Sequence, residues 1–235
     1  MEKFQFINQD KWLSEIMNKN VFSMNIDLAM LCSESFVKKS LPKTNSFIFC
    51  KVPVSKIGSS IFLEKLGFYI VDTQIQMNKK SKAYKKNIKQ TRFVSNDDRV
   101  RVVEIAKNNF VFSRFHLDPS IDNSMANLIK EKWVDNYFNG LRGDYLIVKD
   151  LDSLVIGFLL IIKKGKDFII DLIAVDSNYQ KLGGGSDMIL CLESLFDQEA
   201  TIIVGTQAAN IPSICLYQKH GFRINNSSYI FHYHS

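Results

Sequence analysis

Three consecutive glycines, Gly183, Gly184 and Gly185, follow an apolar segment that ends at Val175 and precede a segment of helical periodicity. Because they carry no side chains, their backbone N–H groups can approach a phosphate, and a helix start adds partial positive charge. The segment lacks the Gly-Lys-Ser/Thr ending of a nucleotide-hydrolysing phosphate loop and the GxGxxG spacing of a dinucleotide fold. The glycines therefore predict an anion site of another kind.

Tyr217 is the second residue whose position indicates chemistry. It lies in a helix predicted over 212–220, which follows Asn210 and ends before Gly221-Phe222. A tyrosine hydroxyl can donate a proton to a leaving group, or it can pack in the core with its hydroxyl satisfied. The sequence leaves both roles open.

A proton acceptor and an anion-binding side chain are the remaining candidates. Asp171 lies within an apolar strand, and the alternation of the strand does not decide which way its carboxylate points. His116 is the other candidate base, and a water relay could replace either residue. Arg114 could pair bidentately with phosphate oxygens or form an ordinary salt bridge.

The elements that position these residues form a mixed α/β pattern. In the N-terminal region we expect strands over 46–54 and 68–77 and a short helix over 59–66, ended by Gly67. In the C-terminal region we expect helices over 97–109, 124–139, 186–196 and 212–220. The strands expected there cover 145–149, 155–163, 167–175 and 201–206, with a closing strand that ends near Tyr233.

A lysine run divides the chain into two regions. It contains Lys79, Lys80, Lys82, Lys85, Lys86 and Lys89 and no acidic residue. We therefore predict an N-terminal domain over 1–78, a linker over 79–93 and a second domain over 94–235. Residues 64–68 (EKLGF) are similar to 218–222 (QKHGF), either by chance or because the first region is a partial copy of the second. Such a copy would be inactive, since Leu63 takes the place of Tyr217.

Composition excludes several classes of protein. The chain has 235 residues, of which 46% are hydrophobic, and its net charge of +6 is explained by the lysine run. A dispersed basic face is missing, so we expect no nucleic-acid partner. The N-terminus lacks a secretion signal, and the longest apolar stretch is too short to span a membrane, which predicts a cytoplasmic protein. The cysteines have no metal-site spacing, so we expect reduced thiols and no metal: Cys32, Cys50, Cys191 and Cys215.

Two groups of residues carry a family resemblance. Val175, Gln180, Gly183 and Gly185 resemble, in their spacing, the acetyl-CoA signature of the GNAT superfamily, Gln/Arg-x-x-Gly-x-Gly/Ala after a strand ending in valine. A second group of residues, about thirty positions later, resembles the second GNAT signature: Asn210, Ser213, Tyr217, Lys219, Gly221 and Phe222. The resemblance covers roughly 94–233. It implies an α/β GNAT fold with a central, mostly antiparallel sheet flanked by helices, preceded by a smaller, partial GNAT-like domain.

The resemblance also implies an N-acetyltransferase that uses acetyl-CoA as cosubstrate. Tyr217 would be the general acid, Asp171 a candidate base, and the backbone amides near Ile173 and Ala174 the oxyanion donors. Contacts with acetyl-CoA are implied at Ile173, Ala174, Val175, Gln180, Lys181, Leu182, Gly183, Gly184, Gly185, Ser186, Asn210 and Ser213.

A narrower resemblance concerns the acceptor. Phe112-Ser113-Arg114-Phe115, Trp133 and Gly205-Thr206-Gln207 are similar to the dTDP-fucosamine acetyltransferases, a branch of the superfamily that acetylates the 4-amine of a nucleotide-linked dideoxyamino sugar. It implies an enzyme of surface polysaccharide synthesis, with Arg114 and His116 as acceptor contacts and a homodimer as its assembly. Two alternatives stay open: another small amine or a protein N-terminus as acceptor, and an acyl-CoA-binding module without turnover.

Overall fold

The computed structural model describes residues 6–81, 88, 90–196 and 199–235, and its strands form one ten-stranded sheet. The strands are β1 (Ile7–Gln9), β2 (Asn20–Met24), β3 (Ser46–Pro53), β4 (Tyr69–Ser81), β5 (Thr91–Phe93), β6 (Tyr145–Leu151), β7 (Leu154–Lys164), β8 (Asp167–Val175), β9 (Ala200–Gln207) and β10 (Arg223–His234). The helices are α1 (Lys11–Met17), α2 (Ile26–Ala29), α3 (Glu34–Ser40), α4 (Ile57–Lys65), α5 (Arg99–Asn108), α6 (Asn123–Phe138), α7 (Gly184–Ser194) and α8 (Ile211–Lys219).

The order of strands across the sheet is β1-β2-β3-β10-β4-β9-β8-β7-β6-β5. Only β2–β3 and β8–β9 pair in parallel among these neighbours, and the other pairs are antiparallel. The predicted mixed α/β fold, with a mostly antiparallel sheet flanked by helices, is therefore confirmed. None of the helices in the described ranges combines the length and apolarity needed to cross a membrane.

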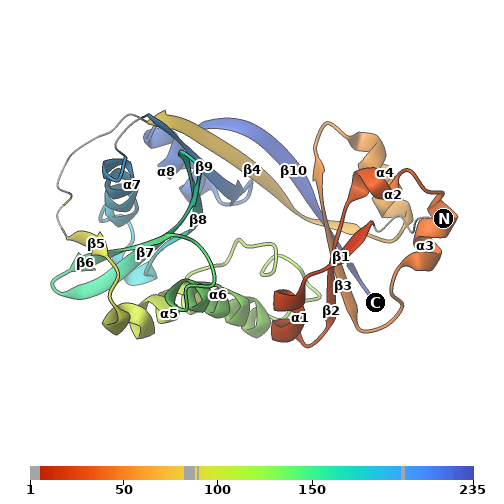
Figure 1. Ribbon diagram of the computed structural model, residues 1–235, viewed down its shortest axis with the longest axis horizontal. Helices are drawn as coiled ribbons and strands as arrows, with labels where there is room; N and C mark the ends of the chain where they lie inside the picture. Colours follow the sequence, from red (N-terminus) through yellow and green to blue (C-terminus); the bar gives the residue numbers. More distant parts are fainter. Residues whose placement is uncertain (1–5, 82–87, 89, 197–198) are drawn as a thin grey trace.

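Helices cover both faces of the sheet. In the C-terminal half, α7 and α8 pack on one face through Met188, Ile189 and Tyr217, and α5 and α6 pack on the other through Val102, Ile105 and Val134. In the N-terminal half, α2, α3 and α4 share a core with β3 and β10, while α1 and α6 share a second core that includes Phe47 and Phe115. Because α6 contributes to cores in both halves, it joins them on one face of the sheet (Figure 1).

Every element predicted from the sequence has a counterpart in the fold, usually within a few residues. The expected strand over 68–77 is longer, because β4 continues to Ser81. Lys79, Lys80 and Ser81 therefore belong to β4 rather than to a linker, and β4 pairs with β9 as far as Ser81↔Ala200. Residues 82–87 and 89 of the predicted linker lie outside the described residues. The division into domains at 78 and 94 remains a prediction.

The two similar pentapeptides form the same local structure. After α4, the N–H groups of Gly67 and Phe68 donate hydrogen bonds to the carbonyls of Glu64 and Leu63. After α8, the N–H groups of Gly221 and Phe222 donate in the same way to the carbonyls of Gln218 and Tyr217. Both glycines have left-handed φ values, +96° and +82°, a conformation that glycine adopts without strain. Each turn leads into one of the long central strands, β4 or β10, which lie side by side (Figure 1).

Candidate functional site

Strands β8 and β9 separate part-way along their length. Their parallel pairing covers Phe168↔Ile202 to Ile170↔Val204, whereas β8 continues to Val175, still paired on its other edge with β7. Between Asp171 and Val175, the edge of β8 that faces β9 therefore has no strand partner within the described sheet. Unpaired backbone N–H and C=O groups are strong hydrogen-bonding groups that need partners. This gap is where the family resemblance implied contacts with acetyl-CoA and the oxyanion donors near Ile173 and Ala174.

A β-bulge at Asp171 determines where its side chain points. Leu160 pairs with Leu172 and Ile161 with Ile170, so Asp171 is the extra residue on β8. A bulge interrupts the alternation of faces, and both Asp171 and Leu172 contact the α5–α6 side of the sheet. The alternation of the sequence could not reveal this orientation.

The Asp171 carboxylate accepts hydrogen bonds from three side chains on this side. Trp133 Nε1 donates at 2.8 Å, the Tyr137 hydroxyl at 2.9 Å, and Arg142 donates from Nε and Nη2 at 2.7 and 2.8 Å. Burial raises the pKa of Asp171, but Arg142 and Trp133 outweigh it and hold the pKa below its usual value. The group is thus ionised and fully engaged. To accept a proton, it would have to release at least one donor.

The glycine loop turns the chain from β8 into α7. Lys181 and Gly183 have φ values of +66° and +90°; Gly183 is the N-cap of α7, and a side chain there would meet nothing within 4 Å. The first N–H groups of a helix have no partner within it, so the amides of Gly184 to Ser186 are available to an anion. Gln180 Nε2 donates to the Val175 carbonyl at 3.2 Å and ties the loop to β8. Leu182 is exposed.

Gly185 has a second role, which the sequence did not indicate. A Cβ atom there would lie 3.1 Å from Leu216 of α8, so the glycine allows α7 and α8 to pack closely. This contact places the start of α7 beside the residue that precedes Tyr217. Asn210 caps α8, because its Oδ1 accepts the Ser213 N–H at 3.2 Å. The predicted role of Asn210 and Ser213 in binding acetyl-CoA stays a prediction.

Tyr217 is 2% exposed and packs against Phe222, with ring centroids 5.5 Å apart. No hydrogen bond to its hydroxyl occurs within the described part of the chain. Because this oxygen is not among the fully buried atoms that lack a partner, it keeps some contact with solvent. Burial raises the pKa of Tyr217 above its usual value. The phenol is therefore neutral at physiological pH, the state that a proton donor needs.

Arg114 and His116 lie in the segment between α5 and α6. The Arg114 guanidinium carbon is 3.9 Å from the Phe49 ring centroid and 4.5 Å from that of Phe115. Both ring nitrogens of His116 are engaged, by Ser113 Oγ at 2.6 Å and by Asn127 Oδ1 at 2.9 Å. His116 thus fixes the shape of the segment, and its contact with the acceptor stays a prediction.

Asp118, two residues further on, ties this segment to β10. Its Oδ2 accepts from His232 Nδ1 at 2.6 Å and His234 Nε2 at 2.8 Å, and its Oδ1 accepts from the Tyr69 hydroxyl at 2.8 Å. Asp118, His232 and His234 offer possible metal-ligand atoms within 4.8 Å of one another. Because each imidazole turns an N–H toward the same carboxylate oxygen, hydrogen bonding accounts for the cluster. Burial lowers the pKa of His232 to about 4, so this ring is neutral at physiological pH.

Asp72 and Lys130 are two buried charged residues that sequence analysis did not select. Asp72 is 7% exposed on β4; burial raises its pKa to about 6, although the Thr73 N–H, the Gln207 side chain and Arg114 act in the opposite direction. Lys130 is 6% exposed on α6. A signal for Lys130 was present, because Ala126, Lys130 and Val134 repeat at the spacing of one helical face, and both apolar members are fully buried.

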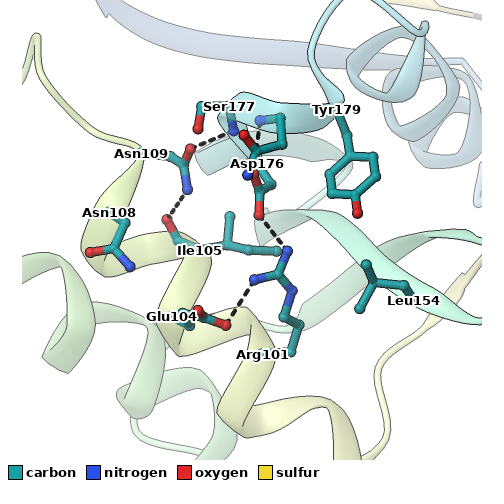
Figure 2. A pocket seen from close by; sticks show the side chains of 10 residues that line it. Arg101, Glu104, Ile105, Asn108, Asn109, Leu154, Asp176, Ser177 and Tyr179 are labelled. Carbon is teal, nitrogen blue, oxygen red and sulfur yellow. Dashed lines mark hydrogen bonds and ion pairs between the residues drawn. The ribbon is translucent and has the colours of Figure 1, made fainter.

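A pocket of about 440 Å³ lies away from Tyr217 and Asp171, between α5 and the segment that leads to the glycine loop (Figure 2). In Figure 2 Arg101 points toward Asp176, with which it forms an ion pair, and Asn109 Oδ1 accepts the Ser177 N–H at 2.7 Å. These contacts fix the chain just beyond β8. They position the glycine loop rather than form a reaction site.

Comparison with known proteins agrees with this geometry. Residues 111–222 match the Acetyltransferase (GNAT) family. A curated relative, the spore coat polysaccharide biosynthesis protein SpsD of Bacillus subtilis (strain 168), is 26% identical over an alignment that covers 94% of this chain and 80% of SpsD.

Two solved structures share the fold. A functionally unknown conserved protein from Staphylococcus epidermidis ATCC 12228 superposes with a TM-score of 0.61 at 16% identity, over 91% of this chain and 84% of its own. A GCN5-related N-acetyltransferase from Sphaerobacter thermophilus superposes with a TM-score of 0.59 at 11% identity, over 97% of this chain and 75% of its own. At these identities the likeness concerns the fold alone.

Proposed function

Because this protein belongs to the GNAT family of acetyltransferases, we propose that it transfers the acetyl group of acetyl-CoA to the amine of a nucleotide-linked amino sugar, with a dTDP-4-amino-4,6-dideoxyhexose as the expected acceptor. It is an acyl-CoA-dependent N-acetyltransferase with acetyl-CoA as cosubstrate. The proposal adds the acceptor, the pathway of surface polysaccharide synthesis and the roles of single residues.

The separation of β8 and β9 is the observation that carries the catalytic part. A backbone amide near Ile173 and Ala174 that faces the open edge of β8 would stabilise the tetrahedral oxyanion, and the start of α7 would bind the pyrophosphate of the cosubstrate. Tyr217, kept neutral by burial, would protonate the departing thiolate. No hydrogen bond to the Tyr217 hydroxyl occurs within the described residues, and the first amides of α7 have no partner within their own helix.

The proton of the attacking amine needs an acceptor. Asp171 was one of the candidate bases, but its carboxylate already accepts hydrogen bonds from Trp133, Tyr137 and Arg142. We propose that Asp171 chiefly orients these side chains and attracts the ammonium form of the acceptor, and that water removes the proton. Proton transfer to Asp171 itself would require Arg142 to move away from it.

Two observations support a nucleotide-linked acceptor. SpsD, similar over most of this chain, is named for polysaccharide biosynthesis. Arg114 forms no ion pair among the described residues and lies on two aromatic rings, an arrangement in which a guanidinium remains available to phosphate oxygens. A homodimer, implied by the resemblance, is retained as a prediction.

Product analysis tests the acceptor. Purified protein is incubated with acetyl-CoA and a dTDP-4-amino-4,6-dideoxyhexose, and the product is examined by NMR. We expect one new amide at the sugar nitrogen. Absence of this product, together with acetylation of a polyamine or of a peptide N-terminus, would reject the sugar acceptor and leave the family assignment intact.

A further inference from the structure

Lys130 is a buried cation without a contacting anion. Lys130 is 6% exposed, and its ammonium nitrogen lies 4.9 Å from the ring centroid of Phe110 and 5.0 Å from that of Trp133. No hydrogen bond or ion pair to Lys130 occurs within the described residues. Its Nζ is nevertheless not among the fully buried atoms that lack a partner, so it keeps some contact with solvent. Burying a charge without a partner is costly.

The neighbouring charges increase this cost. Burial and, to a smaller extent, the charges of Arg114 and Arg142 lower the pKa of Lys130 to about 8, against the attraction of Asp171. Asp171, however, is already paired with Arg142. The electrostatic environment of Lys130 is therefore that of a site missing an anion.

Arg114 is in a similar position. Burial lowers its pKa to about 10, and the two carboxylates that act on it, Asp10 and Asp72, form no ion pair with it. Asp10 Oδ1 instead accepts the Leu13 N–H at the start of α1. The charge of Arg114 also lowers the pKa of Lys130, as a neighbouring cation does.

The two cations lie close to the place where acetyl transfer would occur. Trp133 is one turn beyond Lys130 on α6, and its Nε1 donates to Asp171, the bulge residue at the separation of β8 and β9. One helical turn advances about 5 Å along the axis, which is comparable to the width of one sugar ring. An amine beside Asp171 and an anionic group beside Lys130 could therefore belong to the same acceptor molecule.

We propose that Lys130 and Arg114 together bind a phosphate group of the acceptor, with Lys130 nearest the sugar. This inference rests on the proposed function and assigns the acceptor an anionic group on the side of the sugar away from its amine. Lys130 supplies a point charge and Arg114 a planar pair of donors. Phe49, Phe110 and Trp133 hold the two cations in place through their rings.

Binding of dTDP, measured by calorimetry at low ionic strength, tests the site without catalysis. Lys130→Met keeps the length of the side chain and its packing between the rings but removes the charge. We expect it to weaken dTDP binding at least tenfold, with a similar loss in Arg114→Met and acetyl-CoA affinity within twofold of wild type. Lys132→Met is the matched control on the same helix, since Lys132 is exposed and paired with Glu131 and Asp135. Unchanged dTDP affinity in Lys130→Met overturns the proposal.

A second measurement applies if Lys130→Met does not fold. The wild-type affinity for dTDP should fall between pH 7 and pH 9.5 as Lys130 loses its proton, and Lys130→Arg should bind dTDP with little dependence on pH over this range. The other charged or titratable groups around the two cations are Arg114, Arg142, Asp171, Tyr137, His116, Asp10 and Asp72. A wild-type affinity that is constant over this range would contradict binding through Lys130.

A neutral acceptor separates this inference from the proposed function. Acetylation of the methyl glycoside of the same amino sugar is measured beside the dTDP-linked form. Equal kcat/KM values for the two would reject the phosphate site while leaving sugar acetylation intact. If neither sugar is acetylated but dTDP binding depends on Lys130, the phosphate site is supported and the acceptor assignment fails.

Discussion

At the scale of single residues, Tyr217 and Asp171 show opposite consequences of burial. Tyr217 is buried without a charged partner, so its neutral form is favoured. Asp171 is buried with Arg142 and two further donors, so its charged form is favoured. Burial alone would have shifted both groups toward neutrality, and the hydrogen-bond partners account for the difference.

Removing the Tyr217 hydroxyl should affect chemistry and leave binding intact. We expect Tyr217→Phe to lower kcat by roughly 10- to 1000-fold, because the thiolate loses its proton donor. Its affinity for acetyl-CoA should stay within about twofold, since the ring and its packing on Phe222 are retained. Steady-state kinetics and calorimetry measure the two quantities. A kcat equal to that of wild type would remove Tyr217 from the mechanism.

Asp72 gives a prediction about stability and pH. Because burial raises its pKa to about 6 in the folded state, the folded protein favours the protonated form. The resulting stabilisation is present below about pH 4 and is lost as the pH rises through 6. Asp72→Asn should therefore match wild type near pH 4 and exceed its free energy of unfolding by about 1–2 kcal/mol at pH 7.5, after allowance for partial solvent screening.

Urea unfolding at the two pH values measures this difference. A variant less stable than wild type at pH 7.5 would show that the attraction between ionised Asp72 and Arg114 outweighs the cost of burial. In that case Asp72 would be a structural partner of Arg114.

At the scale of secondary-structure elements, the glycine loop joins conformation to binding. Gly183→Val should weaken acetyl-CoA affinity roughly tenfold or more, because a branched side chain disfavours a φ of +90° and would cover the first amides of α7. Gly165→Val is a matched control. Gly165 has a φ of +63° and open space around its Cα, but it precedes β8, at the end of that strand opposite the loop.

Calorimetry with acetyl-CoA and thermal unfolding distinguish the two variants. Both should lose stability, and only Gly183→Val should lose affinity. Equal acetyl-CoA affinities in the two variants would contradict a binding role for the glycine loop.

Elements with strong periodicity were predictable from the sequence. The strands from β6 to β9 and helices α5 to α8 appear where alternation and helical spacing placed them. The first 45 residues were given no element, because α1, α2 and α3 have only seven, four and seven residues. Their capping residues, Asp10, Asn25 and Ser33, were the readable signals.

The candidate site was predictable only in part. The glycine loop and Tyr217 are close together in the sequence and follow recognisable spacings. Lys130, Asp72 and Arg142 were missed, because their proximity to the site arises from packing between α6, β4 and the turn after α6. The direction of Asp171 depends on a bulge that no alternation pattern reveals.

At the scale of the whole molecule, the sheet has an approximate internal symmetry. Around the β10–β4 pair, each half continues through a strand, β3 or β9, and then through a parallel neighbour, β2 or β8. Each half thus pairs its second-last strand, β3 or β9, with the last strand of the other half, β10 or β4. The same turn, at Gly67 and at Gly221, starts both central strands. This symmetry favours the alternative in which the N-terminal half is a partial copy of the second half, which the similarity of the pentapeptides had left open beside chance.

This arrangement gives the N-terminal half a place in the site. Phe49 of β3 lies under Arg114, Asp72 of β4 acts on the same guanidinium, and Trp12 of α1 packs on Trp133 with ring centroids 5.7 Å apart. The half without a glycine loop would therefore contribute to the proposed acceptor side. The half with the loop contributes the groups expected to bind acetyl-CoA.

Thiol release from acetyl-CoA tests the central claim most directly. The kcat/KM of the purified protein is compared for a dTDP-4-amino-4,6-dideoxyhexose, its UDP-linked counterpart, spermidine, an aminoglycoside and a peptide amine. We predict turnover with a nucleotide-linked amino sugar that exceeds turnover with every other amine by at least a hundredfold. Tight acetyl-CoA binding without thiol release on any acceptor would contradict the claim and indicate an acyl-CoA-binding module.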